Sequence, residues 1–258
     1  MLPTLFISHG SPMMPLRDQP ARDFLVGLGG QLPRPKAILV ASAHWGSERP
    51  EITAVPINTT IHDFFGFPPA LYELTYPAPG DAPLAAEIAA TLSLQGLETT
   101  TDTARGLDHG AWVPLLLMYP AHDIPVMQLS LQAYHGPEHH FGLGKALAAL
   151  RQQDVLVIGS GGLTHNLRRQ RAPEENGPAA PDVDAFAAWM HDALLAGRTN
   201  ELLDYRRLAP YAAAQHPTEE HLLPLFVAMG AGGDGAKATR LHASTSYGVL
   251  RMDTYAFN

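Results

Sequence analysis

The sequence predicts an α/β fold, with one domain over residues 1–258 and a mostly parallel central sheet that carries helices on both faces. Four short apolar runs have the length of strands and show little polar alternation, which is typical of parallel strands buried on both faces. Segments with helical spacing lie between these runs. No internal repeat and no long linker divides the chain, and 258 residues suffice for one large core.

The predicted strands are rich in β-branched and other apolar residues. They cover Thr4 to Ile7, Ala37 to Ala41, Ile124 to Leu131 and Val155 to Ile158. Because helical segments alternate with them, we expect right-handed crossovers and a parallel arrangement.

Four helices are predicted from apolar spacing and from their end signals. The first covers residues 83–96, from a proline at the first helical position to Gly96, and the second covers residues 139–154. The third, residues 182–197, ends at Gly197. Thr218 is expected to cap the fourth, whose residues Leu222, Leu225, Phe226 and Met229 would face the core.

Two irregular segments are long for a compact domain, and loops of that length usually form functional lids or solvated tips. Residues 56–80 are rich in aromatic side chains, which indicates either a pocket wall or plain surface packing. Residues 168–181 are charged and rich in proline, which favours a solvated excursion.

Composition excludes several classes of protein. The chain has 17 Lys and Arg against 25 Asp and Glu, a formal net charge of -8 and no basic stripe, so a nucleic acid is not expected as partner. No apolar run approaches the roughly 20 residues of a membrane span. The absence of cysteine excludes disulfides and thiolate ligands. Since no cationic leader precedes the first apolar run, the cytoplasm is the expected compartment.

Histidines follow three of the predicted strands. His9 comes after the first, His44 after the second and His165 after the fourth. A single histidine at a strand end is most often a hydrogen-bonded loop residue. Because the carboxyl ends of parallel strands meet at one sheet edge, three of them are expected to converge there. Imidazole is a common metal ligand, so the sequence predicts a metal site at this edge.

A fourth histidine is available near the start of the last predicted helix. Glu220 and His221 would lie in its first turn, whereas His216 precedes a proline and is the weaker candidate. Two histidines and one carboxylate are the usual ligands of oxygen-activating ferrous enzymes, so Glu220 competes with His221 as the remaining ligand.

The glycine-rich run GSGGLT after the fourth strand does not have the spacing of a dinucleotide-binding motif. Its residues Gly159, Gly161 and Gly162 are expected to let the backbone turn tightly and approach a ligand. The chain also lacks the nucleophile elbow of a serine hydrolase.

Eight motifs resemble, in order and spacing, those of the DODA-type extradiol aromatic ring-opening dioxygenases, which are related to the catalytic subunit of protocatechuate 4,5-dioxygenase. They lie between His9 and Leu225 and read SHGSPM, SAHW, TIHDFFGFP, LYELTYPAPG, GLDHGAW, MYPAHDIPVMQLSL, THNLR and PTEEHLLPL.

The resemblance implies a metal-dependent enzyme that cleaves a catechol ring with O2. It implies that His9, His44, His165 and His221 line the metal site, and it favours His221 over Glu220. Iron(II) is expected for activity, and zinc(II) is expected in purified protein. His165 is expected to act as acid and base, or as a fourth ligand.

Further residues of the matching motifs are expected around the substrate. His109 would donate a hydrogen bond to bound oxygen or to developing negative charge, or else serve as a structural cap beside Trp112. His62, Asp63 and Phe65, with the neighbouring phenylalanines, would shape the catechol pocket.

Two other functions use the same residues. A zinc-dependent hydrolase, or another non-redox metal enzyme, would employ the same ligands, because zinc usually outcompetes iron at nitrogen sites. A non-catalytic relative is disfavoured because all four histidines are present. No sequence pattern demands a protein partner, so a monomer or a small homo-oligomer is expected.

Overall fold

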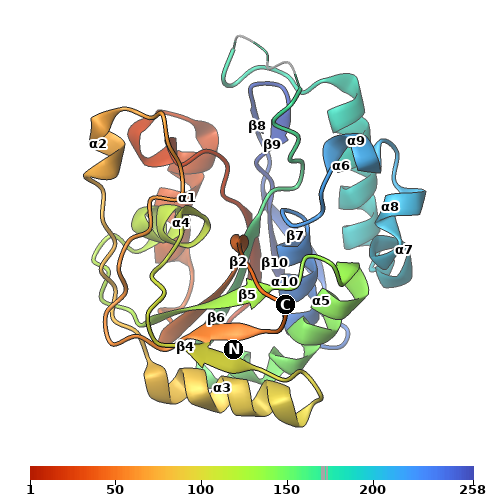
Figure 1. The fold of residues 1–258 in the computed structure, drawn as a ribbon. Coiled ribbons are helices and arrows are strands. Elements are labelled where there is room, and N and C mark those ends of the chain that lie inside the picture. The colour runs from red at the N-terminus through yellow and green to blue at the C-terminus, as the bar shows by residue number, and fades with distance from the viewer. Residues whose placement is uncertain (170–171, 173) are drawn as a thin grey trace.

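The protein, described by a computed structural model over residues 1–169, 172 and 174–258, is built on a twisted eight-stranded sheet (Figure 1). The strand order is β4-β3-β5-β2-β6-β1-β10-β7. These strands are β1 (Thr4–Ser8), β2 (Ala37–Gly46), β3 (Glu51–Thr53), β4 (Thr100–Asp102), β5 (Val126–Leu131), β6 (Val155–Gly161), β7 (Ala238–His242) and β10 (Thr254–Phe257). A separate hairpin pairs β8 (Thr245–Ser246) with β9 (Leu250–Arg251).

The centre of the sheet is parallel and its flanks are mixed. The four predicted strands become β1, β2, β5 and β6, which lie side by side and run parallel. On one side, β10 pairs antiparallel with β1, and β7 pairs antiparallel with β10. On the other side, β3 is antiparallel to β5 and parallel to β4. The prediction of a mostly parallel sheet is therefore confirmed.

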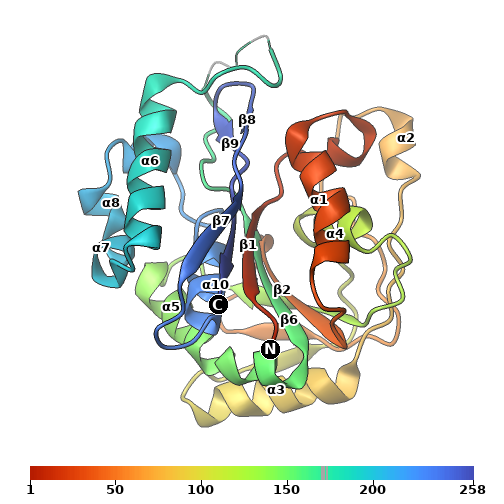
Figure 2. The same cartoon turned by 180° about the vertical axis from the view of Figure 1, so that it is seen from behind.

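Helices cover both faces of the sheet, as predicted (Figure 2). They are α1 (Pro20–Gln31), α2 (Pro69–Tyr72), α3 (Ala82–Leu94), α4 (His109–Met118), α5 (Gly136–Ala146), α6 (Pro181–Leu195), α7 (Thr199–Leu203), α8 (Tyr205–Leu208), α9 (Ala212–Gln215) and α10 (Leu223–Ala231), with the 3-10 helices η1 (Met14–Leu16) and η2 (Ala148–Gln153).

Successive side chains of each parallel strand enter two different cores. In β2, Ile38 and Val40 pack on the side of α1 and α4, whereas Leu39 and Ala41 pack on the side of α3, α5, α6 and α10. Both faces of the central strands are fully covered, which explains why their sequences are continuously apolar.

Three of the four predicted helices are confirmed as α3, α5 with η2, and α6. The prediction that Thr218 caps the fourth helix is wrong, because α10 begins only at Leu223. Pro224 explains the late start: it has no N–H to donate, and its ring would clash with the carbonyl of Glu220 in a longer helix. Leu222, Leu225, Phe226 and Met229 are nevertheless buried, as expected.

The two irregular segments differ in their anchoring. Residues 56–80 contain α2 and are closed by a bridge between Ile57 and Pro79. In the segment 168–181, residues 170, 171 and 173 lie outside the described part. Among the described residues of this segment, Ala172 and Ala180 donate backbone hydrogen bonds to the turn at Tyr247 and Gly248. Residues 172 and 180 are therefore docked on the turn of the β8–β9 hairpin.

Across residues 1–169, 172 and 174–258, none of the helices combines the length and hydropathy that crossing a lipid bilayer requires.

Candidate metal centre

The carboxyl ends of β1, β6 and β2 lie level with one another at one edge of the sheet. Ser8 pairs with Gly161, and Ser42 pairs with Ser160. His9 follows β1 directly, as predicted. His44 lies within the last residues of β2, which continues beyond its predicted end, but the pairing of β2 with β6 already stops at Ser42.

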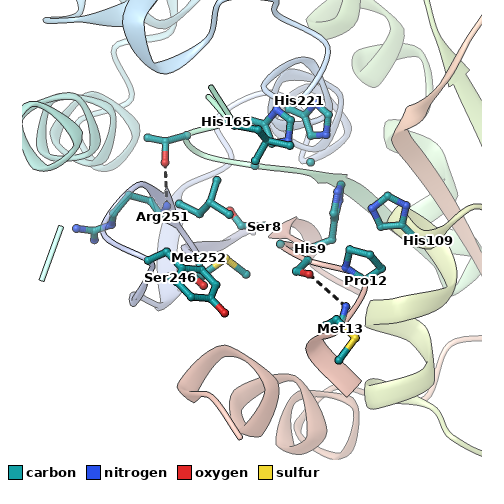
Figure 3. Close-up of a pocket in the computed structure, with 18 of the residues that line it drawn as sticks. Ser8, His9, Pro12, Met13, His109, His165, His221, Ser246, Arg251 and Met252 are labelled. Atoms are coloured by element: carbon teal, nitrogen blue, oxygen red, sulfur yellow. Dashed lines mark hydrogen bonds between the residues drawn. The ribbon is translucent and has the colours of Figure 1, made fainter. Parts of the chain in front are cut away.

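Three histidine side chains converge at this edge. Nε2 of His9 lies 3.0 Å from Nε2 of His44. Each of His9, His44 and His221 offers a nitrogen, and these three atoms lie within 4.8 Å of one another. Figure 3 shows His9 and His221 beside the same cavity, which is also lined by His109 and His165. The spacing is short enough for one ion to contact all three nitrogens.

The opposite ring nitrogen of each histidine lies beside an oxygen acceptor. Nδ1 of His9 lies 3.0 Å from Oγ of Ser160, whose hydroxyl already donates to the carbonyl of Gly110, so Nδ1 must carry the proton. Nδ1 of His44 lies 3.4 Å from Oδ2 of Asp63. These partners leave an Nε2 lone pair on each ring, which is the usual arrangement of metal-ligating histidines.

His221 follows the same pattern. Its Nδ1 lies 3.1 Å from Oε1 of Glu220, and its Nε2 is buried without a hydrogen-bond partner among the described residues. A buried nitrogen without a partner is costly unless a metal or a ligand satisfies it. The donor set therefore fits a divalent metal ion that prefers imidazole.

Burial keeps the imidazoles of His9 and His44 neutral. It lowers the pKa of His9 well below its usual value, with further contributions from the neighbouring histidines, and it lowers the pKa of His44 to about 2. Since only a neutral imidazole can bind a metal, the electrostatics of the cluster agree with its geometry.

His165 lies against His221 rather than beside His9 and His44. The rings of His165 and His221 are stacked, with centroids 3.4 Å apart and an interplanar angle of 7°. The ligand group that includes His165 contains His221 and Glu220. The carboxylate of Glu220 contacts Nδ1 of His221, which points away from the nitrogen facing His9 and His44.

Asp63 and His109 form a pair beside the cluster. His109 is the first residue of α4; its backbone N–H donates to Oδ1 of Asp63 and its Nδ1 donates to Oδ2, at 3.0 and 2.9 Å. Burial favours the neutral acid, but the hydrogen bonds and charge of His109 outweigh it and lower the pKa of Asp63 to about 2. A side-chain anion from a distant loop thus caps α4 and orients His109.

Sequence reasoning missed Asp108, which is fully buried behind the cluster. Its Oδ1 accepts from the hydroxyl of Ser42 at 2.7 Å, and its Oδ2 accepts from Arg105 and Gln128. Ser42 in turn accepts from the backbone N–H of His44. Asp108 stands next to His109 in the motif GLDHGAW, but nothing in that motif indicates where its carboxylate points.

The cavity in front of the histidines has a volume of about 310 Å³ and is walled partly by Phe64 and Phe67. The other residues predicted for the pocket lie elsewhere. Phe65 is 92% exposed and lies outside the lining, and Nε2 of His62 contacts the carbonyl of Leu74 at 3.0 Å. The aromatic segment 56–80 does contribute a wall, but through Phe64 and Phe67 instead of Phe65.

Comparison with known proteins agrees with this arrangement. A family model described as the catalytic LigB subunit of aromatic ring-opening dioxygenase matches residues 3–257. The chain belongs to this family. Its members are metal-dependent extradiol dioxygenases, and the three-histidine cluster gives this chain a matching set of ligands.

Individual relatives cover nearly the whole chain. A 4,5-DOPA dioxygenase extradiol from Beta vulgaris is 46% identical over 98% of this chain and 96% of its own length. A protein of the same name from Escherichia coli K12 is 39% identical over 89% and 85% of the two chains. The crystal structure of an uncharacterized Escherichia coli K12 protein superimposes with a TM-score of 0.82 at 31% identity, covering 100% of both chains.

Proposed function

We propose that this dioxygenase opens a catechol ring at an extradiol bond with O2, using iron(II) held by His9, His44 and His221. The observation that carries the proposal is the convergence of three imidazole nitrogens whose opposite ring nitrogens all lie beside oxygen acceptors. An iron(II) ion bound there would supply open positions for the catechol oxygens and O2 and would carry electrons between them.

The side chains around these ligands supply proton transfer and orientation. His165 faces the cavity from its stacked position on His221, so we assign it the role of acid and base toward a catechol hydroxyl. His109, fixed through Nδ1 by Asp63, presents Nε2 as a partner for oxygen atoms in the cavity. Phe64 and Phe67 offer apolar surface to the ring and exclude water.

The proposal assigns Glu220 an orienting role rather than a ligand role. Its carboxylate holds Nδ1 of His221, so it acts on the metal through the histidine. We expect the protein to be located in the cytoplasm. We also expect it to be a monomer or a small homo-oligomer, and size-exclusion chromatography with light scattering would measure its oligomeric state.

The test compares iron-loaded and zinc-loaded protein. Metal-free protein is loaded anaerobically with either ion and given a catechol panel that includes DOPA, the compound in the names of several relatives. We expect iron-loaded protein to consume one O2 per ring and to form a yellow semialdehyde, and zinc-loaded protein to be inactive. Hydrolytic activity with zinc alone, without O2 uptake, would favour the non-redox alternative.

Variants separate the roles of the residues. His221→Ala should lose iron, whereas Glu220→Gln should keep it with affinity reduced by about 10-fold, because an amide oxygen still accepts from Nδ1. His165→Phe should retain iron and lose turnover; loss of iron would make His165 a ligand. The exposed His135→Phe serves as the matched control.

A further inference from the structure

The cavity in front of the histidines has a cationic wall. Its described lining includes two arginines, Arg17 and Arg251, and no aspartate or glutamate. This contrasts with the formal net charge of -8 for the whole chain. Carboxylates outside the lining pair with both arginines, so the wall can bind an anionic ligand only where a guanidinium keeps donors free.

Arg251 is already engaged within the protein. Its Nε donates to Asp253 at 2.9 Å and its Nη1 to Asp184 at 2.7 Å, while Nη2 also faces Asp253. Burial disfavours the charge on Arg251, but these two carboxylates outweigh burial and raise its pKa. Its guanidinium therefore has a structural role: it holds β9 against Asp184 of α6 and against Asp253, which precedes β10.

Arg17 is engaged at one nitrogen only. Nη1 donates to Oε2 of Glu175 at 3.1 Å and to the hydroxyl of Tyr247. Within the described part of the chain, Nε and Nη2 of Arg17 make no hydrogen bond. The pair with Glu175 is partly exposed, at 40% and 26% of the two side chains, and such pairs hold weakly. These contacts orient the guanidinium and leave one of its edges available.

The same stretch of chain carries Arg17 and the first metal ligand. His9 is followed by a turn at Gly10, where φ is +60°, and then by η1, after which Arg17 comes. Residues 10–13 of this stretch line the cavity, as do His9 and Arg17 themselves. Apolar side chains of Met13, Phe67 and Met252 share the lining.

We propose that Arg17 binds a carboxylate carried on the side chain of the catechol, an inference that rests on the proposed function. The ring lies against the apolar wall with its hydroxyls toward the histidines, and the carboxylate accepts two hydrogen bonds from Nε and Nη2 of Arg17. Tyr247 and Glu175 are positioning residues for the guanidinium. Any preference of the enzyme for a catechol with an anionic side chain over a neutral one therefore depends on Arg17.

The test measures kcat/KM for three catechols that differ in one group: 3-(3,4-dihydroxyphenyl)propanoate, 4-propylcatechol and dopamine. We expect the propanoate to be preferred over 4-propylcatechol by about 10- to 100-fold, and dopamine to be the poorest substrate. Arg17→Gln should reduce the first ratio to within about twofold of one, mainly through KM. Arg17→Lys should give an intermediate ratio because it keeps the charge but loses the planar fork.

Arg34→Gln is the matched control, since Arg34 is also a partly exposed arginine paired with a carboxylate, at 2.7 Å from Asp123, but does not line the cavity. It should leave the preference unchanged. A wild-type enzyme without preference for the carboxylate, or a preference that survives Arg17→Gln, would overturn the assignment.

A binding measurement keeps this inference separate from the proposed function. Anaerobic calorimetric titration of zinc-loaded protein should show tighter binding of the propanoate than of 4-propylcatechol, and Arg17→Gln should remove the difference. If no catechol is turned over, the proposed function fails, and the ratio of dissociation constants still decides whether Arg17 binds carboxylates. Equal dissociation constants in the wild type would refute the carboxylate site.

Discussion

Asp63 links two histidines that come from different elements of the fold. Its Oδ2 lies 2.9 Å from Nδ1 of His109 and 3.4 Å from Nδ1 of His44, and its Oδ1 accepts the first backbone N–H of α4. One carboxylate thus sets the orientation of a ligand candidate and of a hydrogen-bond donor. Because both roles depend on two acceptor oxygens, a neutral isostere is a direct test.

We predict that Asp63→Asn lowers kcat/KM by about 10- to 100-fold, which is the usual effect of losing a partner of a metal-ligating histidine. The amide keeps only one acceptor oxygen, so either the backbone N–H of His109 loses its acceptor at Oδ1, or the two Nδ1 atoms lose theirs at Oδ2. Oxygen uptake and metal content are the measurements, and the exposed Asp192→Asn is the control. Wild-type turnover in Asp63→Asn would contradict this role.

At the scale of secondary-structure elements, the packing of α10 on β6 fixes the position of His221. A Cβ at Gly159 would lie 2.0 Å from the carbonyl of Pro224, and one at Gly161 would lie 2.1 Å from the carbonyl of His221. Gly162 donates its N–H to that same carbonyl at 2.8 Å. The glycines in the last residues of β6 therefore let one segment of backbone approach another, and this contact holds the histidine in place.

We predict that Gly161→Ala destabilises the protein by about 1–3 kcal/mol and weakens metal binding, because the added methyl group pushes the carbonyl of His221 away. Urea unfolding and iron release to a chelator measure the two effects. Gly142→Ala is the control: this exposed position in α5 has no atom within 4 Å of a new Cβ, so stability should stay equal or rise. If Gly161→Ala released iron no faster than the wild type, the contact between Gly161 and His221 would have no role in metal binding.

The parts of the fold that the sequence predicts are those with a strong local pattern. The four central strands are recognisable because both their faces are buried. Strands β3 and β4 have three residues each and carry no such pattern. The insertion of β10 between β1 and β7 depends on pairing between the two ends of the chain, which local composition does not report.

In the candidate site, too, only the residues that follow a strong local pattern can be predicted from the sequence. The topology of a parallel sheet is enough to bring His9 and His44 together. The contact of Asp63 with His109 depends on the path of residues 56–80, and no periodicity describes that path. Adjacent residues can also face opposite ways in a loop: Phe64 lines the cavity while Phe65 is exposed.

At the scale of the whole molecule, buried neutral histidines make stability depend on pH. His140 is fully buried at the start of α5, where Nδ1 donates to the carbonyl of Gly136 at 2.6 Å and Nε2 accepts from the N–H of Gln132 at 3.2 Å. Burial lowers its pKa from 6.5 to about 4. Both ring nitrogens are satisfied only in the neutral form.

We predict that the free energy of unfolding of the metal-free protein falls as the pH drops from 6.5 toward 4. Between these values the unfolded chain binds a proton at His140 and the native state does not, so acid favours unfolding. Well above pH 6.5 His140 is neutral in both states, and the free energy of unfolding no longer depends on its protonation. Between pH 7 and pH 5, the free energy of unfolding of His140→Gln should fall by about 2 kcal/mol less than that of the wild type. Urea unfolding at the two pH values measures both changes. Identical pH slopes for both proteins would rule out this contribution.

The order of the ligands along the chain has a consequence for biosynthesis. Residues 9 and 44 leave the ribosome well before residue 221 and the strand at 254–257 that pairs with β1. Of these three imidazoles, a growing chain therefore presents only those of His9 and His44 until residue 221 has been added. We therefore expect the three-histidine site to be complete only once His221 has been synthesised and packed, so that the folded chain, rather than its early part, selects the ion.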